Sequence, residues 1–497
     1  MSKVIKYMPE LQGDEQLTIA QLMKEMSEEQ AEQFARVYRQ RRKDETTVLL
    51  TTLLAFVGIA GVNRFYVGQI GMGLAYLFTA GFCLIGTIVD IFNYKSLTNS
   101  YNENQALEVD DSRRLSNDNW RVMMRVVKSG IFPLLALMLV IAACEPPPPP
   151  ITDARLAEIS LPDGFEISVF ADSVENARSM VLSPGGVLFV GTRRAGVVHA
   201  LVDRNEDGYA EERYVIAEDL NMPNGVAFRD GSLYVAEVNR ILRYDGIEGQ
   251  LGWPPEPVVV VDDLPTDRHH GWKYINFGPD GKLYVPVGAP CNACDRELPY
   301  ASILRMNPDG SGKEVYASGI RNSLGFTWHP ETGEMWFTDN GRDNMGDDVP
   351  PCELNHAPVA GLHFGFPYIH GMDIPDPEFG EGRTPSEFAL PAQPLGAHVS
   401  PLGLEFVSGA GFPASFQNKI LIAEHGSWNR SKKVGYRISM VSFDTEGNAD
   451  SYEPFATGWL QGEEAWGRPV DLEFLLDGSL LVSDDQEGMV YRIKYTD

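Results

Sequence analysis

Three apolar runs interrupt an otherwise polar first third of the chain. Residues 1–46 are polar with a helical periodicity, and they end in a basic cluster at positions 36–43. Residues 48–62 and 71–92 are apolar; the second run is long enough to cross a bilayer, and the first reaches that length with its flanks. Because Lys and Arg concentrate on the cytoplasmic side of membrane spans, the pattern predicts a cytoplasmic polar segment followed by a transmembrane helical hairpin at residues 47–95.

The third apolar run, at residues 123–144, has the pattern of a bacterial lipoprotein signal. Arg125 and Lys128 precede 13 apolar residues, and the run ends in IAAC, which puts Cys144 in position for cleavage and lipidation. Thirteen apolar residues are few for a span, and a third, uncleaved membrane helix is the alternative. Either arrangement exports the rest of the chain and makes residues 96–122 a cytoplasmic linker.

Beyond a proline-rich spacer at residues 145–153, the helical periodicity gives way to that of strands. A turn followed by a strand recurs six times, as SPGGVLFVGT, RDGSLYVAEV, GPDGKLYVPV, ETGEMWFTDN, FQNKILIAEH and LDGSLLVSDD. The anchor residues of these phrases are Val190, Val235, Val285, Phe337, Ile422 and Val482. Their spacings of 45 to 85 residues suit one four-stranded blade each, with a long insertion after Phe337. The pattern therefore predicts an all-β fold for residues 154–497, a six-bladed β-propeller.

Charge separates the chain at nearly the same place. Residues 1–144 carry 15 basic and 15 acidic side chains, whereas residues 145–497 carry 26 basic and 54 acidic ones. An acidic exported domain repels nucleic acid and anionic lipid, so we expect its partner to be a neutral small molecule or a cationic protein. In an oxidising envelope Cys291 and Cys294 can close a small disulfide loop, and no histidine follows them to support covalent haem.

Several polar residues stand next to the repeated strands, where the loops of a propeller converge on its channel. His270 comes eight residues before the turn of the third repeat, and a neutral imidazole there can take a proton from a substrate hydroxyl. Arg321 and Asn322 precede one strand and Arg468 precedes the last repeat; guanidinium groups bind carboxylates or polarise carbonyls. Residues 338–355 form a loop rich in oxygen ligands of the kind that bind calcium. Together these groups suit an anionic, metal-associated cofactor.

A separate candidate calcium loop is DRNEDGYAEE, at residues 203–212. Its oxygen donors are the side chains of Asp203, Asn205, Asp207 and Glu211 and the carbonyl of Tyr209. Tyr214 stands where a full EF-hand loop has glutamate, so a solvated acidic hairpin is the alternative to structural calcium.

Two longer sets of motifs carry resemblances to known families. GVNRFYVG at residues 61–68, with a late Asp90, resembles the small two-transmembrane-helix domain family over about residues 47–95, which implies no enzymatic activity. The phrases HHGWKYINFGPDGKLYVPVGAPCN, SGIRNSLGF, TDNGRDNMGDDVPPCELN, GFPY, AHVSPLGLEF, AEHGSWNR and WGRPVDLEF resemble a second family over residues 157–495. That family is the soluble glucose and sorbosone dehydrogenases, propellers that carry pyrroloquinoline quinone (PQQ).

The second resemblance implies a role for each residue that it matches. His270 matches the catalytic base of that family. Arg321 and Asn322 match residues that contact the quinone, and His398 and Arg468 match further quinone contacts.

The same resemblance implies a calcium site and brings out two departures. The main-chain carbonyls of Gly341 and Arg342 fall where the family holds its cofactor calcium. The family's cofactor lysine has no lysine counterpart here, and His425 or Arg430 are the candidates to replace it. A second family arginine is replaced by Val470.

The implied function is a membrane-tethered quinoprotein dehydrogenase that oxidises an aldose or a related sugar. Calcium and Arg321 would polarise the quinone carbonyl, His270 would remove the proton of a sugar hydroxyl, and hydride would pass to PQQ. Electrons would then leave to a membrane quinone or a cytochrome at the periplasmic side of a bacterial envelope, which a lipid on Cys144 would favour.

Two other functions fit the same propeller. One is a metal-dependent lactonase that uses the acidic loop, and the other is a non-catalytic binding module. Clustering of His270, Arg321, His398 and Arg468 at one mouth of the channel favours the quinoprotein, whereas scatter of these residues favours the binding module.

Overall fold

The chain divides into two compact units, Met1–Pro147 and Pro148–Asp497, in the computed structural model. The structure describes residues 3–8, 11, 13–43, 47–48, 51–52, 154–409 and 411–496. Nearly all of the expected transmembrane hairpin, and the whole of the linker, the lipoprotein-type signal and the spacer, lie outside the described residues. Within the described ranges, no helix is both long and apolar enough to cross a membrane.

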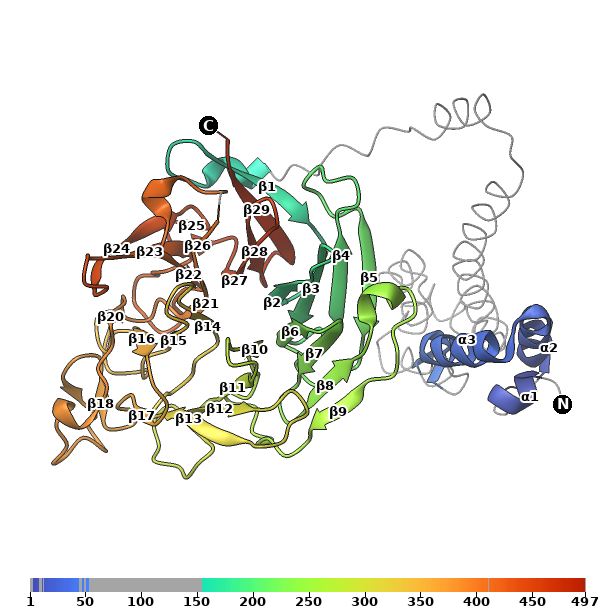
Figure 1. The fold of residues 1–497 in the computed structure, drawn as a ribbon, viewed down its shortest axis with the longest axis horizontal. Coiled ribbons are helices and arrows are strands. Elements are labelled where there is room, and N and C mark those ends of the chain that lie inside the picture. The colour runs from blue at the N-terminus through green and yellow to red at the C-terminus, as the bar shows by residue number, and fades with distance from the viewer. Residues whose placement is uncertain are drawn as a thin grey trace. The chain divides into compact units, whose positions relative to one another are not determined.

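The described part of the first unit is helical (Figure 1). It contains α1 (Lys3–Tyr7), α2 (Gly13–Leu22), a 3-10 turn (Met23–Glu25) and α3 (Glu28–Arg41). Ser27 caps α3: its Oγ accepts from the N–H of Gln30 at 3.1 Å, and the Gln30 side chain accepts from the Ser27 N–H at 2.9 Å. Val4, Ile19 and Phe34, one from each helix, are buried.

The second unit is a ring of six antiparallel sheets, which we call blades 1 to 6 (Figure 1). Blade 1 consists of β2 (Ala177–Leu182), β3 (Val187–Thr192), β4 (Val198–Val202) and β5 (Glu212–Ala217). Blade 2 consists of β6 (Gly225–Arg229), β7 (Ser232–Ala236), β8 (Ile241–Tyr244) and β9 (Val258–Val261). Blade 3 consists of β10 (Asn276–Phe277), β11 (Leu283–Val287), β12 (Ser302–Met306) and β13 (Glu314–Ser318).

The other three blades follow the same order from the channel outward. Blade 4 consists of β14 (Phe326–Trp328), β15 (Met335–Asp339), β16 (Glu353–Ala357) and β20 (Gln393–Pro394). Blade 5 consists of β21 (Pro401–Phe406), β22 (Ile420–Glu424), β23 (Arg437–Phe443) and β24 (Ala449–Ala456). Blade 6 consists of β27 (Pro469–Phe474), β28 (Leu480–Asp484), β29 (Met489–Tyr495) and β1 (Phe165–Ala171). The six anchors of the sequence repeats all lie in second strands, one in each blade, which confirms the predicted six-bladed propeller.

The second strands are buried because both of their faces are covered by neighbouring blades. β3, β15, β22 and β28 are buried along their whole length, whereas the outer strand β9 is largely exposed. One apolar cluster, for example, joins Phe189 of blade 1 to Leu233 and Val235 of blade 2. The core therefore lies between blades, and the second strands read as apolar runs in the sequence.

The ring closes by pairing the first strand of the propeller with its last. β1 pairs antiparallel with β29, in a register that puts Phe165 opposite Tyr495 and Val169 opposite Tyr491. The Phe165 ring also contacts Phe412 and Phe455, with ring centroids 4.7 and 5.3 Å away. Closure leaves the ring of blades without a free end, which protects the sheets from pairing with other chains.

The long insertion expected after Phe337 lies between β16 and β20. In it, β17 (Leu362–His363) pairs in parallel with β13, and β18 (Ile369–His370) forms a hairpin with β19 (Ile374–Pro375). A second hairpin, β25 (Leu460–Gln461) with β26 (Glu464–Ala465), precedes blade 6. Short 3-10 turns occur at Ala154–Glu158, Ile247–Gln250, Pro385–Glu387 and Ala414–Phe416.

Antiparallel order decides which loops can meet. Connections between the second and third strands of a blade, and those from one blade to the next, emerge at the same end of the ring, which we call the convergent end. The turns between first and second strands, and between third and fourth strands, emerge at the opposite end.

Candidate active site

A cavity of about 270 Å³ lies at the convergent end of the propeller. Of the residues singled out from the sequence, six candidates for catalysis or cofactor contact line it, namely His270, Arg321, Asn322, His398, His425 and Arg468. Gly341 lines it too. These residues come from several inter-blade connections and second-to-third-strand loops, so only the closed ring brings them together.

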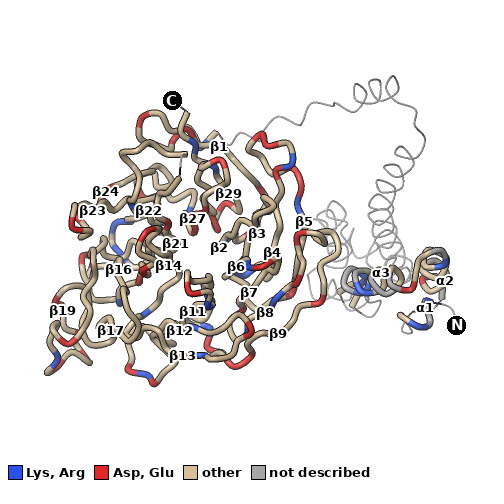
Figure 2. Tube along the Cα trace, in the orientation of Figure 1, with Lys and Arg blue, Asp and Glu red and all other residues tan. Residues whose placement is uncertain are grey.

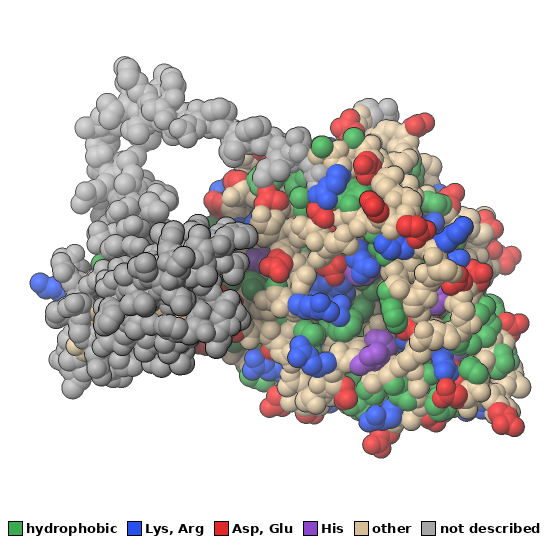
Figure 3. Space-filling model, turned by 180° about the vertical axis from the view of Figure 1, so that it is seen from behind, with side chains coloured by type: hydrophobic (Ala, Val, Ile, Leu, Met, Phe, Trp, Pro, Cys, Tyr) green, Lys and Arg blue, Asp and Glu red, His purple; other side chains and the backbone are tan. Residues whose placement is uncertain are grey.

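The cavity is basic although the domain around it is acidic. Figure 2 shows acidic residues along all parts of the propeller, while in Figure 3 basic and histidine side chains gather around a hollow in the middle of one face. Four guanidinium groups line the cavity, those of Arg178, Arg193, Arg321 and Arg468. In the described part of the chain its lining contains one carboxylate, that of Asp343. Such a site attracts anions by focusing the field of its cations.

His270 is held as a neutral base. Its Nδ1 lies 2.8 Å from the carbonyl oxygen of Ala289, and because a carbonyl only accepts, Nδ1 carries the proton and Nε2 the lone pair. Burial, then the nearby charge of Arg321 and the adjacent His269, lowers the pKa of His270 to about 2. Its backbone adopts a φ of +50°, which a non-glycine residue rarely takes, so the surrounding structure determines this orientation.

Arg321 is buried and nearly saturated with acceptors. Its Nε donates to the Asn292 carbonyl at 2.8 Å, one Nη donates to the Asn340 carbonyl at 3.1 Å, and the other reaches the Asn292 side chain and Asp343 at 2.8 and 2.9 Å. A guanidinium has five N–H groups, so these bonds leave one N–H for a ligand in the cavity. The orientation of that group is therefore set by the protein before any ligand arrives.

The carboxylate of Asp339 fixes the loop that carries Arg321 and Asn322. Asp339, the last residue of β15, accepts from the backbone N–H of Arg321 at 2.8 Å and from that of Asn322 at 2.6 Å. Burial raises the pKa of Asp339 to about 6. On the opposite wall, His398 donates from Nε2 to the Gly346 carbonyl at 2.7 Å, which leaves its Nδ1 as an acceptor.

The predicted disulfide is present and supports this wall. Cys291 and Cys294 are bonded, with Cα atoms 6.1 Å apart. Asn292 lies inside the closed loop and accepts from Arg321 through both its carbonyl and its side chain. The Asn292 side chain also donates to the backbone carbonyl of Asp343 at 2.9 Å and accepts from the backbone N–H of Asp343 at 2.8 Å. The disulfide thus constrains the residue that orients Arg321.

Two residues that sequence reasoning did not single out, Arg178 and Asp485, organise the third wall. Asp485 accepts from His425 Nε2 at 2.8 Å and from Arg178 at 2.9 Å. These two partners hold the pKa of the Asp485 carboxyl far below its ordinary value despite its burial. Arg468 donates to the Tyr436 hydroxyl at 3.2 Å, and Tyr436 in turn donates to the Ser427 carbonyl at 2.6 Å.

A signal in the repeats locates several of the missed residues. Counted along the chain, the position three residues after the anchor is Arg193, Gly288, Asn340, His425 or Asp485 in five of the six repeats. Arg193, Asn340 and His425 line the cavity and Asp485 bonds His425, while a Cβ at Gly288 would come within 2.6 Å of the His270 Cβ. This position of the repeat therefore predicts residues that line the cavity or support its lining.

Gly341 and Arg342 begin the loop after β15 that the sequence identifies with calcium. A Cβ at Gly341 would come 2.7 Å from the Pro351 carbonyl oxygen, so the close approach of the two backbones requires glycine. The Arg342 side chain pairs with Asp376 and with Glu378 (3.0 Å). Both carbonyls are hard oxygen donors of the type that calcium takes. Across the ranges the structure describes, no group of three or more His, Cys, Asp or Glu side chains is arranged to hold a metal ion.

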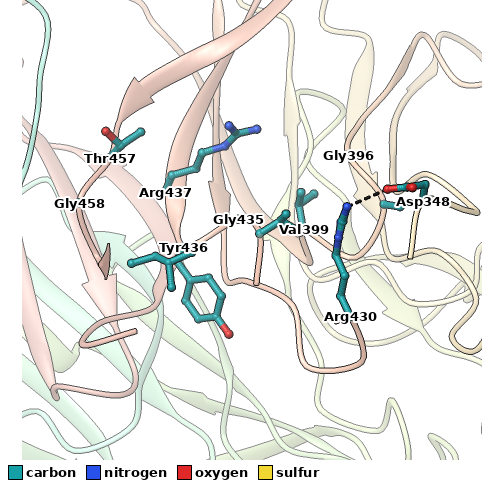
Figure 4. Close-up of a pocket in the computed structure, with 12 residues that line it drawn as sticks. Asp348, Gly396, Val399, Arg430, Gly435, Tyr436, Arg437, Thr457 and Gly458 are labelled. Atoms are coloured by element: carbon teal, nitrogen blue, oxygen red, sulfur yellow. Dashed lines mark hydrogen bonds and ion pairs between the residues drawn. The ribbon is translucent and has the colours of Figure 1, made fainter. Parts of the chain in front are cut away.

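Arg430 does not reach this cavity. It lines an adjoining pocket of about 470 Å³, together with Asp348, Val399 and Tyr436 (Figure 4). Its guanidinium pairs with Asp348 at 2.7 Å, as the dashed line in Figure 4 marks. Of the two candidates to replace a cofactor lysine, His425 is therefore the one inside the cavity.

The loop at residues 203–212 lies at the opposite end of the ring, because it connects β4 to β5. Its carboxylates accept from the loop's own backbone: Asp203 from Gly208 at 2.8 Å, Asp207 from Tyr209 at 2.9 Å, and Glu211 from Arg204 at 3.0 Å. Burial raises the pKa of Asp203. This loop is separate from the cavity, and calcium binding by Asp203, Asn205, Asp207, Tyr209 and Glu211 stays a prediction.

Three family models match the chain. The glucose/sorbosone dehydrogenase model matches residues 257–427, the TM2 domain model matches residues 44–92, and a TrAA12-like model matches residues 384–496. The first and third cover much of the propeller, and the second covers the expected transmembrane hairpin.

Individual proteins are similar over the propeller. An uncharacterized protein of Borreliella burgdorferi is 32% identical over 352 residues, which are 68% of this chain and 91% of that protein. A pyrroloquinoline quinone-dependent pyranose dehydrogenase of Coprinopsis cinerea is 22% identical over 68% of this chain, and the chain spans 54% of its length. The calcium structure of a Trichoderma reesei carbohydrate-active enzyme of family AA12 superposes with a TM-score of 0.60 at 20% identity, covering 68% of this chain and 97% of that one.

Proposed function

Since this chain belongs to the glucose/sorbosone dehydrogenase family and carries a TM2 domain, we propose that it is a membrane-tethered quinoprotein that oxidises an aldose or a related sugar with PQQ. The observation that carries the proposal is the convergence of His270, Arg321, His398 and Arg468 on one cavity. A lactonase does not require the two arginines there, and a binding module does not require convergence.

The donor set of the cavity suits a cofactor with several carboxylates. Arg321 keeps one free N–H, and the Arg468 side chain is hydrogen-bonded in the described chain by the Tyr436 hydroxyl, so both guanidinium groups can donate to carboxylates. His398 keeps Nδ1 as an acceptor for a ligand N–H or O–H. These groups, with Asn322 and His425, would hold PQQ, and the carbonyls of Gly341 and Arg342 would hold its calcium. PQQ supplies the acceptor for the hydride that leaves the sugar carbon.

His270 would act as the general base through Nε2. The Nδ1–H bond to Ala289 aims the ring and accommodates the positive charge that appears when Nε2 takes the hydroxyl proton. Arg321 beside it makes the imidazolium unfavourable, so the proton is released readily once the product leaves. The Arg321 N–H that remains would stabilise negative charge developing on the ligand, as a fixed donor in a buried site.

Tethering is the second part of the proposal. The TM2 match at residues 44–92 and the lipoprotein-type pattern ending at Cys144 support an anchored N-terminal part in the inner membrane of a bacterial envelope. The disulfide between Cys291 and Cys294 fits an oxidising, periplasmic location of the propeller. An anchored propeller could pass electrons to a membrane quinone or a cytochrome.

The test is aldose-dependent dye reduction by the full chain in detergent, with PQQ and calcium added. We expect turnover that requires both additions and that falls at least about 100-fold in His270→Gln, because general base catalysis contributes about 10²–10⁴-fold. His356→Gln is the matched control, since His356 pairs with Glu334 on blade 4, away from the cavity. Full activity of His270→Gln would remove the assigned base, and the absence of PQQ binding would remove the proposed function.

A further inference from the structure

Two donors on one wall of the cavity have no acceptor. Arg193 lies in the loop between β3 and β4, and Trp272 comes two residues after His270; both line the cavity. The Nε of Arg193 and the Nε1 of Trp272 are buried, and neither forms a hydrogen bond within the described residues. Because buried N–H groups are nearly always paired, this pair of donors indicates a ligand that accepts hydrogen bonds.

The two side chains form a rigid unit. The Arg193 guanidinium stacks over the Trp272 indole, with its Cζ 3.7 Å from the ring centroid. Trp272 packs in turn on Leu324, Leu402 and Val470. The stacking contact restricts the guanidinium, and its Nε remains without an acceptor in the described residues. A guanidinium N–H of this kind can bind a carboxylate.

The distribution of charge around Arg193 also favours the binding of an anion. Arg321 pairs with Asp343 and Arg178 pairs with Asp485, both at 2.9 Å. Arg193, by contrast, has no ion pair among the residues described. Burial and the neighbouring Arg178 lower its pKa to about 10, so an arriving negative charge would relieve an unfavourable concentration of positive charge.

We propose that Arg193 and Trp272 form a second carboxylate site in the cavity, where the β3–β4 loop of blade 1 meets the connection between blades 2 and 3. The inference rests on the proposed function for the identity of its ligand, which is either a carboxylate of PQQ or the carboxylate of an acidic sugar. Trp272 contacts both the apolar group that contains Val470 and the Arg193 guanidinium. The resemblance assigned a role to neither residue: Trp272 lies within one of its phrases without a role, and Arg193 lies outside all of them.

Binding measured by calorimetry on the full chain in detergent tests the site without turnover. The ligands are PQQ with calcium, and glucuronate against glucose. The variants are Arg193→Gln, Trp272→Phe, which keeps the ring and removes the N–H, and the matched control Arg194→Gln, because Arg194 is exposed and lies outside the cavity. Thermal unfolding of each variant confirms that it is folded.

We expect Arg193→Gln to weaken the carboxylate ligand about 10- to 100-fold, as the loss of a charge-assisted bond does, and Trp272→Phe to weaken it less. Arg194→Gln should change the affinity by under about twofold, as an exposed charge does. A loss confined to PQQ identifies a cofactor carboxylate as the ligand. A loss of the preference for glucuronate over glucose identifies an acidic sugar.

Two results separate this inference from the proposed function. If PQQ binds and Arg193→Gln alters neither PQQ affinity nor glucuronate preference, the carboxylate site is refuted and the dehydrogenase stands. If the wild type binds no PQQ, the proposed function is refuted, and the carboxylate site survives only if glucuronate binds in a way that depends on Arg193. Failure of both ligands to bind overturns both.

Discussion

The protonation state of His270 decides how the proposed reaction responds to acid. An imidazole with the ordinary pKa of about 6.5 is about 97% protonated at pH 5, which would lower kcat/KM about 30-fold by removing the base. In this cavity burial, Arg321 and His269 lower the pKa of His270 to about 2. A lowered pKa keeps the neutral form present as the pH falls, so His270 stays mostly unprotonated at pH 5. The neutral form of His270 is therefore expected to persist at mildly acidic pH.

The assay is the pH profile of kcat/KM, which reports the groups of the free enzyme. We expect His270 to impose no acid limb between pH 7.5 and pH 5, so that kcat/KM changes by less than about twofold over this range. The ring centroids of His269 and His270 are 4.1 Å apart. The variant His269→Gln removes the neighbouring imidazole, so any remaining titration in its pH profile cannot come from His269. An acid limb with an apparent pKa near 6.5 that persists in His269→Gln would refute the reasoning, because it would place the base in an environment like water.

Three further predictions test the supports of the site and the ring. Asn292→Ala removes a side-chain acceptor of Arg321 and both side-chain bonds to Asp343. We expect kcat/KM to fall about 10- to 100-fold, with the fold retained as judged by circular dichroism. Unchanged kinetics would show that Arg321 does not need this support. Gly341→Ala puts a Cβ 2.7 Å from a backbone oxygen, so it should weaken calcium-dependent PQQ binding measured by calorimetry, whereas Gly249→Ala, with open space around it, should not. Phe165→Ala, at the closure strand, should lower the free energy of unfolding by about 3–5 kcal/mol in denaturant titrations, because a buried ring is lost; a loss under about 1 kcal/mol would mean that closure does not depend on this packing.

The contrast between a basic cavity and an acidic domain bears on what enters the site. Outside the cavity, acidic residues outnumber basic ones throughout the propeller (Figure 2), so an anionic ligand is repelled by the surface and attracted only at the convergent end. Because surface charges are screened over about 8 Å at physiological salt, the repulsion is weak at a distance and the buried guanidinium groups dominate close to the cavity. Binding of an anion there is consequently expected to be local and selective.

The linear sequence determined the architecture because the signals for a propeller are local. Each turn and second strand is a short phrase whose apolar run is buried on both faces, so six phrases predict six blades and their order. The pairing of Cys291 with Cys294 was also within reach of the sequence, since only two residues separate them. His270, Arg321 and Arg468 were found because each stands next to a repeated strand, at the end where loops must converge.

Only the tertiary structure decided which side chains share the cavity. Arg430 and His425 are five residues apart on one loop, yet they line different pockets, because the path of that loop is set by non-local contacts with Asp348 and Asp485. Arg193 and Trp272 are far apart in the chain and stack on each other only because the ring brings blade 1 to the connection before blade 3. Strand periodicity is a property of neighbours in sequence, whereas the composition of a cavity depends on contacts that form only when the ring closes.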